Sequence, residues 1–421
     1  MGRNAAQINS SEGSLQRMDR RPATARPHTV RRMNRAVVME LIRGNQPLSR
    51  ADLARMTGIH RSNISLIVDE LQKDGLLHEE RGAGNGRGRI PTLLSLSRDK
   101  FRVIGISVRR AKTTVALAAL DGTIESTYIF ETPEEPERFV VAVEDACHVM
   151  MQHVSAGAKG RLRIRQMVVS IPGIVTREKR ITRIWTPGLP RYIESDLAAD
   201  LSKRTKIPTV VANNAGLAAM AALHSTELTK QPLLNDFVFL MIGDVGVGSG
   251  VVIQRSLYSG YDAAYAGEVG HTVIDPNGPP CNCGRRGCWQ LYVCDAATWA
   301  RFQPNTPFSQ EVYQQFLEEV RHGNPKAVAA LRNTAKYLSL GISNIALTLN
   351  PERILLAGAL TSVWPKLEPE LRSAFFLPHH HAIIQPIDVP VDSLFLRGAV
   401  ERAIDLVIER SSGSANDLSS G

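Results

Sequence analysis

The chain has 421 residues, 43% of them hydrophobic, so it is long enough for two or three domains that each bury a core. It has no N-terminal apolar segment typical of a signal peptide and no apolar run near the roughly 18 residues of a membrane span, which favours a cytosolic (cytoplasmic) protein without membrane insertion. Residues 1–100 carry 18 Lys/Arg against 10 Asp/Glu, so nearly all of the net charge of +9 lies at one end.

The basic end of the chain has two possible explanations. A positive segment joined to a neutral body is typical of a nucleic-acid-binding module attached to a different kind of domain. Alternatively, the charge belongs to a solvated tail, because residues 20–32, RRPATARPHTVRR, are rich in Pro and Arg. We expect residues 1–29 to be disordered, and the pattern of the following residues favours the first explanation.

Three helices are predicted between residues 34 and 73. The first covers residues 34–43, where apolar residues recur at helical spacing, and it ends at Gly44. The second begins with a capping box formed by Ser49 and Asp52 in SRADLARMTG. The third, within HRSNISLIVDELQKDGLL, has a polar face and an apolar face made of Ile64, Ile67, Val68 and Leu71.

The second and third helices form a predicted helix-turn-helix, a motif that sets its second helix into the major groove of DNA. Residues 75–96 then have the pattern of a strand, a glycine loop and a strand, which predicts a wing that touches phosphate or the minor groove. We therefore predict a DNA-binding winged helix-turn-helix over residues 30–98, although a small helical domain that never meets DNA would share this pattern. The predicted DNA contacts are Arg50, His60, Arg61, Ser62, Asn63 and Ser65 on the helices and Arg81, Arg87 and Arg89 on the wing.

From residue 101 the pattern becomes that of an α/β protein. FRVIGISV and TTVALAALDGTI have the apolar, β-branched composition of strands, and Asp121-Gly122 marks a hairpin turn. A similar strand, loop and strand returns in residues 237–260, which indicates two related lobes. Helices are predicted over residues 214–224, 324–349 and 396–408, and residues 411–421 are expected to be a disordered tail.

The loop at residues 267–290, GEVGHTVIDPNGPPCNCGRRGCWQ, contains a candidate metal site. One imidazole and three thiolates are the soft, tetrahedral set that zinc prefers, and four protein ligands leave no open position for catalysis. We therefore predict one structural zinc ion per chain. Free thiols, an adventitious disulfide and a nucleic-acid zinc finger are the alternatives; the last lacks a helix with paired histidines. The predicted ligands are His271, Cys281, Cys283 and Cys288.

A winged helix-turn-helix ahead of a two-lobed body with GEVGH, DPNGPPCNCGRRGCWQ and LNPERILLAG resembles the ROK family of repressors, open reading frames and sugar kinases. The resemblance extends over residues 30–410. It implies an actin-like (ribonuclease-H-like) body with a sugar pocket between lobe 1, residues 99–216 plus 395–410, and lobe 2, residues 217–394. The N-terminal module is typical of the repressor branch, whose members bind palindromic operators as dimers or tetramers and respond to a sugar, a sugar derivative or a protein.

Two segments depart from the pattern of the family's kinases. In those enzymes an Asp-x-Gly-Gly-Thr segment after the first strand grips the nucleotide phosphates, whereas here Ser107–Ala111 includes Arg109 and Arg110. The kinases also carry Asn-Asp-Ala-Asn, whose aspartate is the general base, whereas this chain has Asn214 at that position. An amide cannot accept the proton of a sugar hydroxyl, so we expect no kinase activity.

The resemblance assigns sugar contacts to Asn213, Asn214, Glu268, His271 and Gln290. The position of Gln290 is normally a glutamate, so the ligand or its affinity is expected to differ from the usual hexose. The two asparagines could instead act only as a helix N-cap. We predict a sugar-responsive repressor of carbohydrate uptake or metabolism genes; the alternative is a repressor controlled by a protein partner, with a degenerate pocket.

Overall fold

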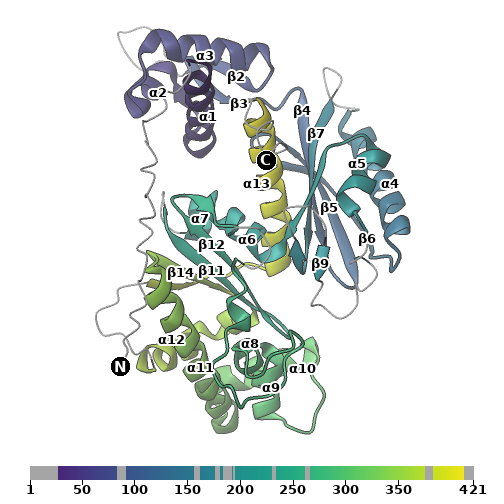
Figure 1. Ribbon diagram of the computed structural model, residues 1–421, viewed down its shortest axis with the longest axis vertical. Helices are drawn as coiled ribbons and strands as arrows, with labels where there is room; N and C mark the ends of the chain where they lie inside the picture. The colour runs from purple at the N-terminus through teal and green to yellow at the C-terminus, as the bar shows by residue number, and fades with distance from the viewer. Residues whose placement is uncertain are drawn as a thin grey trace, which may run out of the picture.

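The structure of the protein is a computed structural model that describes residues 27–82, 92–155, 162–175, 181–183, 192, 195–229, 234–260, 266–374 and 383–411 (Figure 1). Two of the predicted wing residues, Arg87 and Arg89, lie outside these ranges. So do residues 1–26 and 412–421, which make up most of the two predicted tails. None of the helices in the described ranges combines the length and the apolar character needed to cross a membrane.

The N-terminal unit has the predicted arrangement of three helices and a small sheet. Ser49 caps the second helix and Asp52 bonds back to the Ser49 backbone, so the predicted capping box is confirmed. Gly58 ends this helix with a φ of 70°, in the left-handed region where glycine is favoured. The sheet has the order β1-β3-β2. The elements are α1 (Pro27–Asn45), β1 (Leu48–Ser49), α2 (Arg50–Thr57), α3 (Arg61–Lys73), β2 (Leu77–Arg81) and β3 (Thr92–Leu96).

Helix α1 is longer than the sequence pattern predicts, because it begins at Pro27 rather than at residue 34. Residues 27–29, which were expected in the disordered tail, are helical in the structure. Arg31, in the added part of the helix, pairs with Glu70 on α3, and Arg35, in the predicted part, pairs with both Glu70 and Asp74. Arg31 and Glu70, like Arg35 and Asp74, are 39 residues apart in the sequence. Local helical spacing therefore does not reveal these pairs.

The body contains two five-stranded sheets with the same topology. Their strand orders are β10-β7-β4-β5-β6 and β13-β12-β11-β14-β15. In each sheet the first three strands in chain order are antiparallel and the last two are parallel to the first. The prediction of two related lobes is thus confirmed. The strands are β4 (Phe101–Val108), β5 (Lys112–Ala119), β6 (Ile124–Glu131), β7 (Arg163–Ile171), β10 (Thr209–Asn213), β11 (Phe237–Ile242), β12 (Val247–Ile253), β13 (Ser256–Leu257), β14 (Arg353–Ala357) and β15 (Ile383–Pro386).

Helices cover both faces of each sheet, and successive side chains of the central strands pack against them in alternation. In β4, Ile104 and Ile106 pack against α4 (Pro136–Ser155) and α5 (Leu197–Thr205), whereas Val103 faces α13 (Val391–Ser411). In β11, Leu240 packs against helices of the second lobe and Phe239 faces α6 (Asn214–Leu223) and α13. Successive side chains of a strand point to opposite faces, so strands that are apolar throughout must be covered on both sides.

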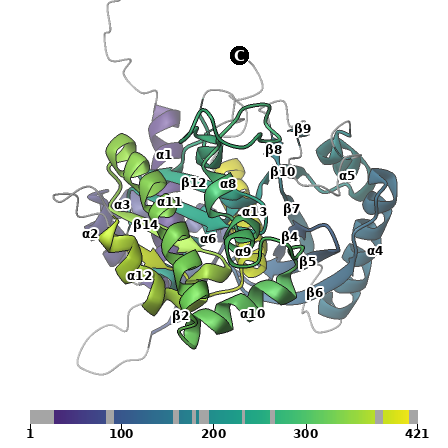
Figure 2. The same ribbon diagram turned by 90° about the horizontal axis from the view of Figure 1, so that it is seen from below.

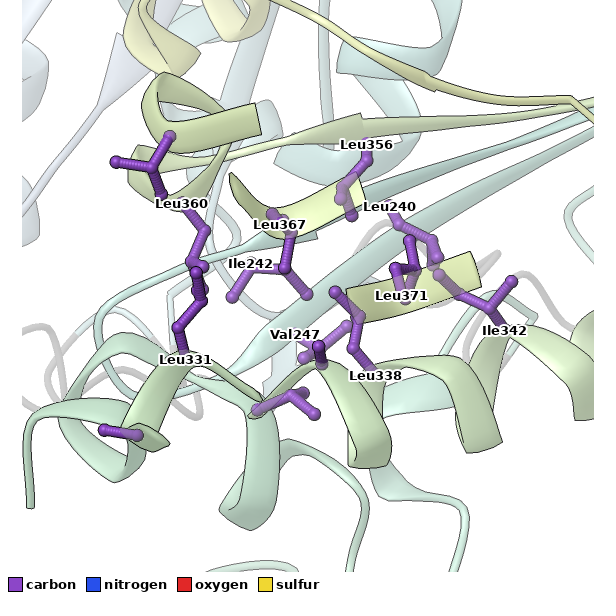
Figure 3. Packing of buried hydrophobic residues seen from close by; sticks show 14 of the residues in the cluster. Leu240, Ile242, Val247, Leu331, Leu338, Ile342, Leu356, Leu360, Leu367 and Leu371 are labelled. Carbon is purple, nitrogen blue, oxygen red and sulfur yellow. The ribbon is translucent and has the colours of Figure 1, made fainter. Parts of the chain in front are cut away.

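The second lobe has its main core between β11, β12 and β14 and a group of helices. Figure 3 shows Leu240, Ile242 and Leu356 from the strands in contact with a layer that includes Leu338 and Leu367. In Figure 2, α8 and α9 lie beside α11, the long helix of this group. Pro325 occupies the first turn of α11, where its missing N–H leaves no helical hydrogen bond unmade. The helices are α8 (Gln290–Val293), α9 (Asp295–Phe302), α10 (Gln310–Arg321), α11 (Pro325–Leu349) and α12 (Trp364–Ser373).

Helices α6 and α13 form the central layer between the two sheets (Figure 1). A Cβ added at Gly398 of α13 would lie 1.8 Å from the backbone oxygen of Leu217 on α6. On the other side of α6, a Cβ at Gly250 of β12 would lie 2.5 Å from that of Ala219. The boundary expected at residue 216 therefore divides α6, a single helix that contacts both lobes; the boundaries themselves stay a prediction.

The crossing of α6 and α13 predicts a position-specific effect of adding one methyl group. Gly398→Ala should lower the free energy of unfolding by at least about 2 kcal/mol, because the new Cβ meets backbone that cannot move aside without separating the helices. Gly44→Ala is the matched control, since Gly44 lies in α1 with no atom within 4 Å of its added Cβ. It should be neutral or stabilising by up to about 1 kcal/mol. Equal effects of the two changes in denaturant unfolding would contradict this description of the crossing.

Candidate functional site

The candidate metal loop is a compact turn held by its own backbone. It follows a short helical turn, η2 (Val269–His271), and returns antiparallel to itself at Val273 and Cys288. The Cys281 N–H donates to the oxygen of Arg285 at 2.8 Å. Gly287 has a φ of 65°, and a Cβ there would lie 1.5 Å from the oxygen of Asp275. The close return of the chain therefore requires glycine and brings the cysteines together.

The four predicted ligands converge on one point. The ligand atoms of His271, Cys281, Cys283 and Cys288 all lie within 4.8 Å of one another. The Sγ of Cys281 is 3.5 Å from the Nδ1 of His271, and the Sγ atoms of Cys283 and Cys288 are also 3.5 Å apart. Ligands about 2.0–2.3 Å from a tetrahedral zinc ion are separated by distances of this order. None of the five cysteines forms a disulfide in the structure, which argues against the alternative of an adventitious disulfide.

The residues present fit a closed, structural zinc site. Three of the four ligands are buried and Cys283 is partly exposed. The four possible ligands are one nitrogen and three sulfurs, and none of them is a carboxylate. Four protein ligands complete a tetrahedron around the ion, which is typical of zinc sites that stabilise folding. Such an ion would join η2 to the start of α8 across the loop. Two further cysteines, Cys147 and Cys294, are buried outside the cluster, where burial raises the pKa of each thiol to about 12 and about 11 respectively.

The other ring nitrogen of His271 faces a partly buried carboxylate. Its Nε2 lies 3.9 Å from an oxygen of Glu268, the residue that precedes η2. Burial raises the pKa of the Glu268 carboxyl to about 7. A carboxyl group in such a poorly hydrated place gains from a hydroxyl partner, and a metal-bound imidazole is oriented by the group at its second nitrogen.

Gln290 also touches the metal loop. Its Nε2 donates to the Sγ of Cys281 at 3.5 Å, while its Oε1 lies beside Gly246 and Gly270, 3.2 Å and 3.3 Å from the positions their Cβ atoms would take. A thiolate accepts hydrogen bonds, so an amide suits this position, whereas a glutamate carboxylate would place a second negative charge there. The contact gives a structural reason for glutamine at a place where the ROK resemblance leads one to expect glutamate.

The asparagine pair lies at the N-terminus of α6. Asn213 is the N-cap: its Oδ1 accepts from the backbone of Ala215 at 2.8 Å and of Gly216 at 3.2 Å, and its Nδ2 donates to the oxygen of Gly173 at 2.8 Å. The capping role considered from sequence is therefore confirmed for Asn213. Asn214 is the first residue of the helix and is buried.

The β11–β12 turn connects the asparagines to the metal loop. On one side, a Cβ added to Gly248 would lie 2.9 Å from that of Ala215, next to Asn214. On the other side, a Cβ added to Gly270 would lie 2.6 Å from the oxygen of Val247, and the hydroxyl of Ser249 donates to the Gly267 oxygen. The glycines of GDVGVGSGV thus allow α6 and η2 to approach the same strand. Ser249 was not predicted from sequence, where a serine between glycines carries no distinctive signal.

The segment in place of the kinase phosphate grip lies between β4 and β5 and contacts α13. The Nε of Arg109 is 3.2 Å from an oxygen of Asp392, and its guanidinium lies 5.3 Å from the centre of the Phe395 ring. Arg109 therefore binds the first turns of α13. Backbone N–H groups framed by glycines, which would cradle phosphates, are replaced here by a bulky side chain with an internal partner.

The predicted reading helix presents polar residues at its N-terminus. Arg61, Ser62 and Asn63 are exposed, while Ile64 and Ile67 of the same helix are buried. His60 caps the helix: its Nδ1 accepts from the Ser62 N–H and lies 2.8 Å from the Ser62 hydroxyl. A free N-terminal turn of this kind is the part of a recognition helix that meets base edges.

The remaining predicted DNA contacts differ in their surroundings. Ser65 is partly exposed and Arg81, at the end of β2, is exposed. Arg50, in contrast, binds the side chains of Asp69 at 2.7 Å, Gln72 at 3.1 Å and Glu79 at 3.3 Å. Its guanidinium thus joins α2 to α3 and β2 within the unit.

Arg43, whose side chain is largely buried, was not among the predicted functional residues. Arg43, near the end of α1, pairs with Glu401 and Asp405 of α13. A lone arginine among the apolar residues VVMELIRGN is a weak local signal, and its partners are about 360 positions away, so sequence spacing could not identify them.

Comparisons with known proteins match both parts of this architecture. A family model described as the ROK family matches residues 103–376, more than half of the 421 residues. A second model, described as the MarR family, matches residues 30–88. These two matches coincide with the body and with the winged helix-turn-helix.

Individual relatives include repressors and a kinase. A xylose repressor of Bacillus subtilis (strain 168) is 28% identical over 345 residues, which are 82% of this chain and 86% of the repressor. An N-acetylmannosamine kinase of Haemophilus influenzae (strain PittGG) is 27% identical over 264 residues, 62% of this chain and 81% of the kinase. A solved ROK family transcriptional regulator, described as a homolog of the E. coli MLC protein, has a TM-score of 0.72 at 23% identity, with coverage of 91% of this chain and 99% of that one.

The cluster predicts that metal content depends on the loop thiols and not on buried thiols in general. Cys283→Ala should abolish the expected one zinc per chain, measured by plasma mass spectrometry after gel filtration, because three ligands no longer close the coordination sphere. Cys147→Ala, which removes a buried thiol outside the cluster, should keep the zinc. Full zinc occupancy in Cys283→Ala would rule out the site as drawn.

Proposed function

The chain belongs to the ROK family, and we propose that it is a DNA-binding transcriptional repressor whose affinity for its operator is controlled by a sugar or sugar derivative. The observation that carries this proposal is the combination, in one chain, of a winged helix-turn-helix with an exposed polar helix start and a ROK body. The xylose repressors among its relatives, which match more than 80% of the chain, support the same role.

We propose that DNA is read by the exposed start of α3. Arg61 and Asn63 have the side chains that suit guanine and adenine in the major groove, and Arg81, which is exposed at the end of β2, would contact phosphate. Arg87 and Arg89 keep their proposed role as wing contacts. Since a palindromic operator requires a two-fold arrangement of recognition helices, the protein is proposed to act as a homodimer or homotetramer. Arg50 is the least suited of the predicted contacts, because its guanidinium already has three internal partners.

The ligand is proposed to bind where the asparagines, Glu268 and the metal loop approach β12. Buried polar groups on several elements suit a sugar, whose hydroxyls both donate and accept. A structural zinc ion on His271 and the three cysteines would fix the imidazole, and through it Glu268, on one side of that site. Gln290 would act mainly by its bond to Cys281.

Sugar phosphorylation is not part of the proposed function. By the ROK resemblance, Asn214, the first residue of α6, would stand where the kinases carry the general base, and Arg109, which is bound to Asp392, would stand where they carry the phosphate grip. Both the proton acceptor and the nucleotide cradle would have to be rebuilt for kinase chemistry. Repressor relatives are consistent with this reading, although the family also includes kinases.

Specific DNA binding should depend on Asn63. A palindrome selected by the protein from random duplex DNA is the probe, and Asn63→Ala should weaken binding to it about tenfold or more, as expected for loss of 1–3 kcal/mol of base readout. Asn344→Ala is the matched control, because Asn344 is an exposed asparagine on α11 in the second lobe. Fluorescence anisotropy at two salt concentrations is the measurement. Failure to select any DNA, or equal binding by Asn63→Ala, would count against the repressor.

Ligand binding should depend on Glu268 and should not lead to phosphorylation. Calorimetry at pH 8, above the Glu268 pKa of about 7, with D-xylose, D-glucose, N-acetylglucosamine and N-acetylmannosamine should reveal at least one ligand. Glu268→Gln should weaken its binding about tenfold, because a hydrogen bond to an ionised carboxylate is lost. The control Glu318→Gln changes an exposed carboxylate on α10. No ADP should be released from ATP with any of the sugars. If none of them binds a protein that still binds its DNA, control by a protein partner becomes the better hypothesis.

A further inference from the structure

A charged cluster lies buried between the winged helix-turn-helix and the body. Arg43 of α1 donates to the carboxylates of Glu401 and Asp405 on α13, and also to the backbone oxygen of Glu401 at 3.0 Å. The side chain of Arg43 is only 8% exposed, and those of its two partners are less than 20% exposed. The guanidinium therefore meets three acceptors on one helix in a fixed geometry.

The apolar surroundings of the cluster disfavour any arrangement that separates Arg43 from the two carboxylates. Val38 and Ile42 of α1 and Ile404 and Val407 of α13 belong to one continuous apolar core around it. Burial alone would raise the pKa of the Asp405 carboxyl, but the neighbouring charges of Arg43 and His224 hold that pKa well below its usual range. The side chains of Glu401 and Asp405 are both less than one fifth exposed, so a shift of α1 along α13 would leave charges buried without a partner.

The other end of α1 holds the recognition helix. Arg31 pairs with Glu70, and Arg35 pairs with Asp74 and Glu70, all on the last turns of α3 and the residue after it. Helix α1 is therefore bound to α3 near its start and to α13 near its end. A rotation of α13 relative to the winged helix-turn-helix would therefore move this helix.

A third contact brings the cluster within reach of the ligand site. His224 follows α6 directly and is 10% exposed, and its Nε2 lies 3.8 Å from an oxygen of Asp405. The opposite end of α6 carries Asn213 and Asn214. Ten residues of helix are about 15 Å long and move as a rigid unit. The backbone contact between Leu217 and Gly398 adds a second connection between α6 and α13.

We propose that the cluster of Arg43, Glu401, Asp405 and His224 is the junction that sets the orientation of the winged helix-turn-helix and passes movements of α6 from the ligand site to α3. These four are positioning residues: they touch neither the proposed ligand nor DNA. The proposal rests on the proposed function for its ligand and its operator. The alternative is a flexible tether, in which the winged helix-turn-helix would be linked to the body only by the connecting chain and would not follow its movements.

The test measures sugar binding and DNA binding separately from the effect of the sugar on DNA binding. His224→Leu removes the α6 contact with little change in volume, and Arg43→Lys keeps the charge while losing the fork of donors. Arg332→Met is the control, because it removes an exposed arginine that pairs with Glu370 in the second lobe. For each variant, calorimetry with the sugar that binds the wild type gives ligand affinity, and anisotropy with the selected palindrome gives DNA affinity with and without that sugar.

His224→Leu and Arg43→Lys should bind the sugar within about twofold of wild type, while the ratio of DNA affinities without and with sugar falls at least fivefold toward one. Arg332→Met should keep the wild-type ratio. Folded variants that keep the wild-type ratio would overturn the proposal, and circular dichroism establishes that they are folded.

A separate measurement covers the case in which the wild type binds DNA but no sugar alters that binding. The sugar-controlled function then fails, whereas the junction is still tested by hydrogen exchange of the ligand-free protein. Arg43→Lys should speed exchange at least threefold in residues 27–45 relative to Arg332→Met. Unchanged exchange there would overturn the junction itself.

Discussion

The close crossing of α6 and α13 is the constraint on which the other features depend. Gly398 brings the backbone of α13 onto that of α6, and Gly250 brings β12 onto the opposite side of the same helix. Only small residues allow this stack, which explains why α6 consists largely of alanine. Because the two sheets meet through these helices, the N-terminus of α6 lies beside β12 and the C-terminal helix reaches the DNA-reading unit.

The metal loop, in the second lobe, approaches β12 on the side opposite the N-terminus of α6. A zinc ion held by its four candidate ligands would fix η2 and the start of α8 and would have no open position for reactive chemistry. Glu268 and Gln290 are then held from opposite sides of the loop, one against the imidazole and one against a thiol. Gly246 and Gly270 leave room for the side-chain amide of Gln290. The proposed ligand site, assembled from separate segments in this way, would be sensitive to the relative position of the lobes, as a ligand sensor requires.

The winged helix-turn-helix shares a core with the body. The apolar cluster that contains Ile42 and Ile64 continues into Val103 of β4 and Ile404 of α13. Charged residues then define the orientation, with Arg43 on the body side and Arg31 and Arg35 on the side of the recognition helix. A packed interface with specific ion pairs has few alternative arrangements. A movement of α13 would therefore change the direction of α3, whereas a flexible linker would absorb such a movement.

Local patterns in the sequence determined the winged helix-turn-helix, its capping box, the two similar lobes and the four residues of the metal cluster, because each depends on spacing between near neighbours. The ROK resemblance added the proposed sugar contacts, including the asparagines, of which Asn213 proved to be an N-cap. Only the tertiary structure decided the full length of α1, the bond from Gln290 to Cys281 and the partners of Arg43. Arg43 and Glu401 are 358 residues apart. Such pairs are selected by how helices pack, and no periodicity along the chain encodes that packing.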